Sequence, residues 1–246
     1  MKWGLIFGAI ALALAGVAGA MYVPEPARPV DLQAELRKIH PANRPILIVA
    51  YGHSVPSGYF KTPTVQTFDS YPHLFHLALA EAYPGAIISV MTPTKGGETS
   101  REGAARSERD VLSRRPDLVT IDYGLNDVHI AIHAARKAWV SMIEAAKASG
   151  AEVILLTPTR YAGETVELSQ HAAQIRELGR EYGVPVADSY AAWTKHGDIP
   201  SLLSDVNHPN RAGHELVAAE LMLAFASINH PRQPAHEAAN PAALPR

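Results

Sequence analysis

Apolar runs of five to seven residues alternate with longer amphipathic stretches along the middle of the chain. The first run is PILIVAY at 45–51, and similar runs follow at 86–91, 117–123, 152–157 and 184–188. Continuous apolar runs of this length are typical of strands that are buried on both faces of a parallel sheet. The pattern therefore predicts five strands.

Helical periodicity fills the intervals between these runs. We expect helices over residues 30–39, 71–83, 101–115, 128–149, 166–182 and 209–226. Gly150 and Gly183 stand where two of these helices should end. Ser100 is placed to cap the helix over 101–115, and Pro209 suits the first turn of the last helix because its missing N–H costs nothing there. Strands that alternate with helices predict an α/β fold whose parallel sheet is covered on both faces.

The same pattern divides the 246 residues into four segments. Residues 1–20 combine a lysine, an apolar run and the small residues Ala-Gly-Ala, which are the parts of a secretory signal; an uncleaved N-terminal membrane anchor is the alternative. Residues 21–43 form a proline-rich lead-in, and residues 44–228 form one domain. Residues 229–246 are expected to be a disordered tail. Either interpretation of 1–20 predicts an exported protein, periplasmic or secreted.

Composition narrows the classes of function. The net charge of -2 gives no sign of a nucleic-acid partner, and contact with a membrane is expected only if residues 1–20 are retained. Because cysteine is absent, disulfides and thiolate metal sites are excluded. His129 and His133 stand four apart on a predicted helix, but no third ligand accompanies them, so we expect an exposed helix face and no metal. Nothing in the composition indicates an oligomeric state.

Four short segments carry the chemistry of acyl transfer through a serine. They are Gly-His-Ser at 52–54, Gly-Gly-Glu-Thr at 96–99, Gly-Leu-Asn-Asp at 124–127 and Asp-Val-Asn-His at 205–208. The first three follow predicted strands, and the carboxyl ends of parallel strands meet at one edge of a sheet. We therefore expect the four segments to form one site.

Within these segments, Ser54 is the candidate nucleophile and His208 the base that would take its proton. Asp205, three residues before the histidine, would orient the imidazole and stabilise its charged form. Read alone, Ser54 is a turn or helix-cap residue, and Asp205 is equally consistent with a turn. The amide of Asn126 and the backbone N–H groups of Gly97 and Ser54 are candidate donors to an oxyanion. A helix cap would also explain Asn126, and a plain turn would also explain Gly97.

The four segments resemble the sequence blocks of the SGNH hydrolases, also called the GDSL esterase/lipase family. The resemblance covers about residues 44–228. It implies a flavodoxin-like three-layer sandwich with a five-stranded parallel sheet, and hydrolysis of esters or thioesters through an acyl-serine without metal or organic cofactor. It also implies the roles given above to Ser54, Asp205 and His208, and to the oxyanion donors Gly97 and Asn126.

Two positions depart from the family pattern. His53 stands where the first block usually has aspartate, and the second block lacks the common asparagine before its glycines. Because Gly97-Glu98-Thr99 matches the Gly-x-Thr ending of that block, Gly97 is preferred to Gly96. His53 and Tyr123 are candidate pocket residues, and Tyr51, Tyr59 and Phe60 fall near the same edge of the predicted sheet.

These expectations combine into an exported serine esterase. A short acyl group, acetyl above all, on a carbohydrate is the favoured substrate, so the expected partner is a small-molecule or glycan ester. A lipase, lysophospholipase or thioesterase is the alternative among enzymes. A glycan-binding descendant that has lost turnover is the alternative outside enzymes, because His53 replaces a family residue beside the nucleophile.

Overall fold

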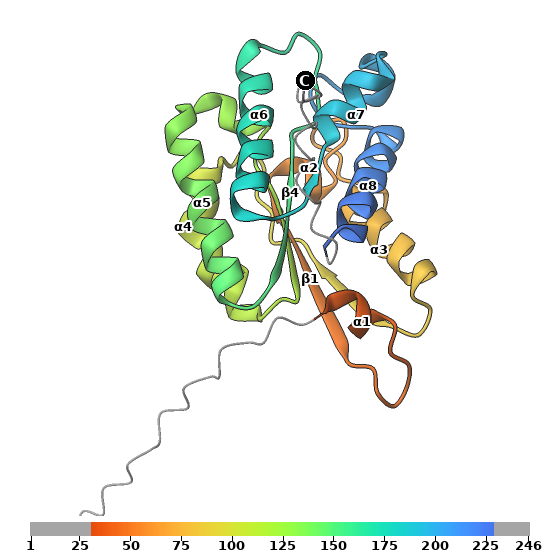
Figure 1. Ribbon diagram of the computed structural model, residues 1–246. Coiled ribbons are helices and arrows are strands. Elements are labelled where there is room, and N and C mark those ends of the chain that lie inside the picture. The colour runs from red at the N-terminus through yellow and green to blue at the C-terminus, as the bar shows by residue number, and fades with distance from the viewer. Residues whose placement is uncertain (1–30, 229–246) are drawn as a thin grey trace, which may run out of the picture.

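The computed structural model describes residues 31–228, and Figure 1 shows them as one central sheet with helices packed on both faces. The strands are all parallel and follow the order β2-β1-β3-β4-β5. Their bounds are β1 (Pro45–Gly52), β2 (Ile87–Met91), β3 (Leu118–Asp122), β4 (Glu152–Leu156) and β5 (Val186–Ala187). The predicted three-layer α/β sandwich with a five-stranded parallel sheet is confirmed, and its strand order is the flavodoxin-like one.

Helices cover the two faces of the sheet as separate layers. One layer consists of α4 (Ser100–Asp110), α5 (Ile132–Ala148) and α6 (Val166–Tyr182). The other consists of α1 (Leu32–Leu36), α3 (Tyr71–Ala82), α7 (Ser189–His196) and α8 (Arg211–Ala226). Shorter pieces complete the described chain: α2 (Ser54–Ser57), η1 (Thr67–Asp69), η2 (Leu112–Arg114), η3 (Asn126–His129) and η4 (Pro200–Leu202).

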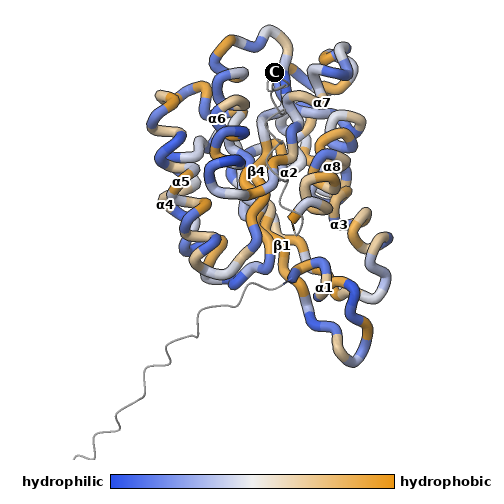
Figure 2. Tube along the Cα trace, in the orientation of Figure 1, coloured by the Kyte–Doolittle hydropathy of each residue, from blue (hydrophilic) through white to orange (hydrophobic). Residues whose placement is uncertain are grey.

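Two hydrophobic cores lie on opposite sides of the sheet because successive strand residues point to opposite faces. In β1, Ile46 and Ile48 belong to the core beneath α3 and α8, whereas Val49 belongs to the core beneath α5 and α6. Figure 2 shows the resulting apolar strands inside more polar helices. The continuous apolar runs of the sequence therefore reflect burial on both faces.

Several predicted helix details are wrong. The helix expected over 128–149 is interrupted at Ile130 and Ala131, whose backbones are extended, so His129 and His133 lie in different elements. Thr99, not Ser100, caps α4, because its side chain and that of Glu102 form a reciprocal capping box. 

The last helix likewise begins later than expected. Asn210 caps α8 by accepting the N–H of Gly213 at 3.1 Å, which leaves Pro209 outside the first turn. By contrast, α6 spans Val166–Tyr182 and ends at Gly183 as predicted, with that glycine at φ 62°. Helices α2 and α7 were not expected from the periodicity.

The predicted signal or anchor at 1–20 and the predicted tail at 229–246 lie outside the described residues. The predicted lead-in, 21–43, is described only from residue 31 onward. There, Leu32 and Leu36 are buried against the core, and Gln33 donates to the carbonyl of Phe225 at 3.2 Å. Part of the lead-in therefore packs on the domain. Within 31–228, no helix has both the length and the apolar character needed to cross a membrane.

Candidate active site

The nucleophile candidate sits where β1 ends. Ser54 is the first residue of α2, and His53 caps that helix by accepting the N–H of Val55 at its Nδ1 atom, 3.3 Å away. Gly52, just before, lies so close to β3 that a Cβ atom there would stand 2.4 Å from the carbonyl oxygen of Asp122. A glycine is therefore required for β1 to deliver Ser54 at this edge of the sheet.

The structure brings Ser54, His208 and Asp205 into one hydrogen-bonded chain. Ser54 Oγ lies 3.0 Å from His208 Nε2, and His208 Nδ1 lies 2.8 Å from Asp205 Oδ2. Ser54 and His208 are each 8% exposed, so the hydroxyl and the ring are shielded but not sealed from solvent. These contacts join residues that are 154 positions apart in sequence.

The Asp205 carboxylate is held in its charged form. Burial acts to raise the pKa of Asp205, but hydrogen bonds from the His208 ring and from backbone N–H groups outweigh it and lower this pKa to about 2. Its Oδ1 atom accepts the N–H of Asn207 at 3.0 Å and of His208 at 2.8 Å. An ionised carboxylate at Nδ1 favours the tautomer with the proton on Nδ1, which leaves Nε2 free to accept from Ser54.

The backbone around His208 closes on itself. Leu203 and Pro209 form an antiparallel bridge, and Ser204 donates its N–H to the carbonyl of His208 at 2.9 Å. On the outside, the Tyr59 ring stacks on the imidazole with centroids 5.8 Å apart. Both the loop and the stacked ring restrict the imidazole to the orientation that faces Ser54.

The loop that carries Gly97 lies against the nucleophile helix. Lys95 donates its N–H to the carbonyl of Gly52 at 3.2 Å, and Ser57 Oγ donates to Thr94 Oγ1 at 2.6 Å. A Cβ atom built on Gly96 would lie 3.9 Å from Ser54 Cβ. Gly97 itself has φ 76° and open space around its Cα atom. Gly97 is exposed, so this part of the loop faces solvent.

Asn126 belongs to the same assembly. Its Nδ2 atom donates to the carbonyl of Glu98 at 3.0 Å, which uses one of the two amide hydrogens and leaves the other available. The neighbouring Asp127 accepts the N–H of Ser100 and the indole N–H of Trp139, both at 2.7 Å, as a buried structural carboxylate. Asn126 thus links the third sequence block directly to the second, and Asp127 links it to Ser100, the residue that follows the second block.

The predicted pocket residues His53 and Tyr123 do not line an open pocket, because they are 1% and 0% exposed. His53 Nε2 faces the Asp122 carboxylate at 3.4 Å, and the Tyr123 hydroxyl donates to Glu98 at 3.1 Å. Hydropathy does not distinguish a half-buried tyrosine from a fully buried one, so the sequence did not show that Tyr123 is buried. Tyr59, half-buried against His208, is the aromatic residue at the site.

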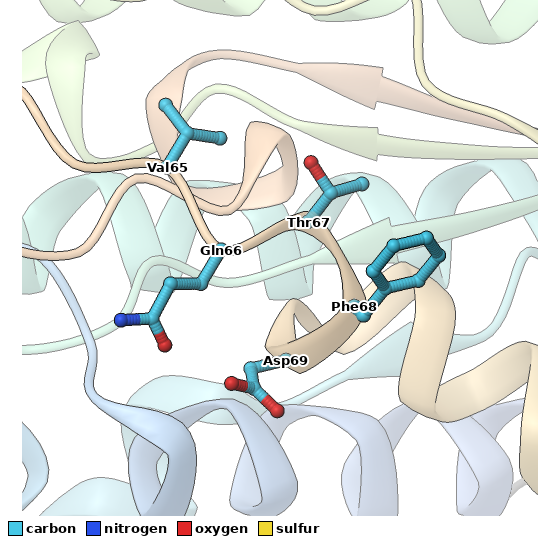
Figure 3. A pocket seen from close by; sticks show the side chains of 5 residues that line it. All are labelled: Val65, Gln66, Thr67, Phe68 and Asp69. Carbon is cyan, nitrogen blue, oxygen red and sulfur yellow. The ribbon is translucent and has the colours of Figure 1, made fainter.

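A surface depression of about 440 Å³ lies on the segment that follows α2 and on η1 (Figure 3). Its lining consists of Val65, Gln66, Thr67, Phe68 and Asp69. Neither Ser54, His208 nor Asp205 lines it. The segment that follows α2 also contacts Asp205, because the N–H of Thr62 donates to Asp205 Oδ2 at 3.4 Å.

Sequence reasoning missed two residues that support the site, Arg106 and the side chain of Glu98. The guanidinium of Arg106 donates from Nε to both carboxylate oxygens of Glu98, at 2.8 and 2.9 Å. Glu98 precedes α4 and Arg106 lies within it, so their eight-residue spacing matches no helical or strand periodicity that would predict a contact. Within the described residues, no three His, Cys, Asp or Glu side chains gather as metal ligands.

Comparison with known proteins agrees with this geometry. A curated acetylxylan esterase from Geobacillus stearothermophilus is 27% identical over 160 residues, which are 57% of this chain and 73% of that protein. A solved structure of an acetylxylan esterase from the same organism has a TM-score of 0.65 and 22% identity, covering 73% of this chain and 94% of that one. A Parabacteroides merdae structure described as a GDSL-like lipase has a TM-score of 0.63 at 18% identity, over 74% and 95% of the two chains.

The resemblance inferred from the four sequence blocks is confirmed on the scale of the whole domain. The sequence profile of the GDSL-like lipase/acylhydrolase family matches residues 50–216, which include Ser54, Gly97, Asn126, Asp205 and His208. The chain therefore belongs to the GDSL-like lipase/acylhydrolase family and is a serine hydrolase of ester bonds.

Proposed function

We propose that the protein is an exported esterase that removes short acyl groups, acetyl above all, from carbohydrates through an acyl-serine intermediate. The hydrogen-bonded chain from Ser54 through His208 to Asp205 is the observation that carries the proposed mechanism. The composition of residues 1–20 supports export.

In the first half of the reaction, Ser54 Oγ attacks the ester carbonyl while His208 Nε2 accepts its proton across 3.0 Å. Asp205, ionised at neutral pH, stabilises the imidazolium that forms. Negative charge develops on the former carbonyl oxygen, and the N–H groups of Ser54 and Gly97 with the Asn126 amide donate to it. His208 then gives its proton to the departing alcohol.

In the second half, water takes the place of the alcohol. His208 accepts a proton from this water, the hydroxide oxygen attacks the acyl carbonyl, and a second oxyanion forms at the same donors. Collapse of this intermediate breaks the bond to Ser54 Oγ, returns the proton to that oxygen and releases the carboxylic acid. No cofactor takes part in these steps.

The acetyl-carbohydrate substrate rests on likeness to the acetylxylan esterases. The solved structures of the Geobacillus esterase include mutants called catalytic, in which a serine, an aspartate or a histidine is replaced by alanine. The aspartate and histidine of that protein are three positions apart, as are Asp205 and His208 here. This shared spacing supports the proposed roles.

Hydrolysis of p-nitrophenyl acetate by purified protein, next to Ser54→Ala, tests the chemistry. We expect Ser54→Ala to lower kcat by about a thousand-fold or more. Equal rates for the two proteins would favour the glycan-binding alternative. A series from acetyl to palmitoyl esters, together with acetylated xylo-oligosaccharides, tests the substrate; fastest turnover of long acyl chains would favour a lipase or thioesterase.

The proposed export is tested separately, by intact-mass measurement of full-length protein expressed in a bacterial host and recovered outside the cytoplasm. We expect a loss of residues 1–20 from the chain. An uncut chain in the membrane fraction would favour the anchor.

A further inference from the structure

The oxyanion loop, residues 93–98, has little backbone structure of its own. Thr94 N–H donates to the carbonyl of Thr92 at 2.7 Å, at the start of the loop, but Lys95 N–H to Gly52 at 3.2 Å and Glu98 N–H to Lys95 at 3.3 Å are both long. Gly96 and Gly97 stand at its centre, and glycines leave a backbone free to take many conformations. Something outside the loop must therefore hold its donors in place.

The Arg106 guanidinium, on α4, binds both ends of this loop. Its Nη1 atom donates to the carbonyl of Pro93 at 2.8 Å, at the start of the loop. Its Nε atom donates to both Glu98 carboxylate oxygens, and Nη2 contacts one of them as well, at the end of the loop. One planar group thus fixes the distance between the two ends.

The surroundings keep this ion pair in one arrangement. The side chains of Arg106 and Glu98 are 14% and 2% exposed, so water competes little for their hydrogen bonds. The guanidinium lies over the Tyr51 ring, 4.7 Å from its centroid, and the Tyr123 hydroxyl donates to Glu98 at 3.1 Å. The two tyrosine rings meet edge to face at 5.4 Å.

Glu98 also connects the ion pair to the second donor. Its carbonyl accepts the Asn126 amide at 3.0 Å, so the residue held by Arg106 through its side chain orients Asn126 through its backbone. The N–H of Gly97 lies one residue away along the chain. A shift of Glu98 would therefore move both oxyanion donors together.

We propose that the buried Arg106–Glu98 ion pair is the positioning element of the oxyanion site: it holds Gly97 and Asn126 in the geometry that stabilises the transition state, without touching substrate. This inference rests on the proposed acyl-serine mechanism. It assigns a function to the two buried aromatic rings as well, because Tyr51 and Tyr123 enclose the ion pair rather than the substrate.

The test compares Arg106→Met, Arg106→Lys and Glu98→Gln with the unaltered protein, using p-nitrophenyl acetate. We expect kcat to fall about 10- to 100-fold in Arg106→Met with KM changed less than about 3-fold, because positioning acts on the transition state more than on substrate binding. Arg106→Lys keeps the charge but loses the paired geometry, so its kcat should lie between that of Arg106→Met and that of the unaltered protein. The affinity for a boronic acid, which forms an anionic tetrahedral adduct with a serine, should fall in parallel with kcat.

Arg44→Met is the matched control, because Arg44 pairs with Asp117 at 2.7 Å near the amino ends of β1 and β3. We expect this variant to keep its kcat. Near-normal kcat and boronic acid affinity in folded Arg106→Met would overturn the proposal, as would equal losses in Arg106→Met and Arg44→Met. If Arg106→Met does not fold, Arg106→Lys and Glu98→Gln decide. If none of the three folds, the pair maintains the domain rather than the loop, and the proposal is wrong. Activity that survives Ser54→Ala would instead overturn the mechanism itself.

Discussion

His53 Nε2 lies 3.4 Å from Asp122 Oδ1, and both side chains are buried, with His53 next in sequence to the proposed nucleophile Ser54. Since His53 Nδ1 accepts the N–H of Val55, the ring's hydrogen sits on Nε2, beside the carboxylate but without a hydrogen bond to it. The other oxygen of Asp122 accepts the hydroxyl of Tyr71 at 3.1 Å. A carboxylate therefore still lies beside the residue before Ser54, but it comes from β3.

We predict that His53→Asp, which restores the usual family residue, destabilises the protein. Two carboxyl groups would then face each other in the interior, where ionising both of them costs much free energy. The free energy of unfolding should fall by about 3 kcal/mol at pH 7, and the loss should grow as pH rises, because the buried carboxyl must stay protonated. Urea unfolding at several pH values measures both effects.

The double variant His53→Asp with Asp122→Asn is the control for this interpretation. It removes one of the two facing charges while keeping the size of both side chains. Recovery of at least half of the lost stability is expected. A double variant no more stable than His53→Asp alone would show that charge repulsion is not the cause.

Asp205→Asn should lower kcat by about a thousand-fold or more while leaving the fold intact. The asparagine oxygen can still accept the N–H groups of Asn207 and His208, so the loop should persist. The imidazolium, however, loses its carboxylate, and the favoured tautomer changes. Steady-state kinetics with circular dichroism measure the two effects. Asp198→Asn, an exposed aspartate, should keep full activity.

Acid should weaken the protein through His214. Burial lowers the pKa of His214 to about 3, with the charge of His208 a smaller cause, and its Nδ1 atom accepts the N–H of Tyr71 at 3.2 Å. The unfolded chain binds a proton here below about pH 6.5, whereas the folded chain does not. The contribution of His214 to the free energy of unfolding is therefore fully present above pH 6.5 and is lost as the pH falls toward 3.

The measurable consequence is a loss of about 2 kcal/mol in the free energy of unfolding between pH 7 and pH 5 from this group. His214→Asn, whose side-chain oxygen can accept the same N–H, should be less stable at pH 7 but should lose less stability over that interval. Parallel pH profiles for the two proteins would assign the acid sensitivity to other groups.

Gly52→Ala and Gly97→Ala should differ sharply although both glycines flank the site. A Cβ atom at Gly52 would stand 2.4 Å from the backbone oxygen of Asp122 and 2.8 Å from Pro56, so two strands would have to separate. At Gly97 nothing lies within 4 Å, and the cost is only that of φ 76° for alanine, about 1 to 2 kcal/mol. Thermal unfolding of both variants measures the difference; equal losses would contradict it.

The sequence alone predicted the parts of the protein that depend on short-range pattern. The apolar runs placed each strand to within about two residues of its observed start, and chain order placed Ser54 and Asn126 at one edge of the sheet. It did not predict the break at Ile130 and Ala131, because neither residue is a glycine or a proline and the apolar pattern continues through them.

The remaining misses depend on tertiary contacts. His53 is polar and next to the nucleophile, which suggested a pocket residue, but only the closeness of β3 gives it a buried partner in Asp122. Arg106 stands on a helix that looks solvated along its length, with nothing local to show that it turns inward to Glu98. Buried polar pairs of this kind become visible only when distant segments are assembled.

The separation of 154 positions between Ser54 and His208 has a consequence for the life of the chain. When the ribosome has completed the sheet, the chain carries the proposed nucleophile and the proposed oxyanion donors, but the proposed base, His208, has not yet been made. A chain that ends before residue 205 would therefore hold the proposed nucleophile without its proposed base. Under the proposed mechanism, hydrolysis would begin only when the segment with Asp205 and His208 has docked beside Ser54, so turnover would report that the chain is made and folded through this segment.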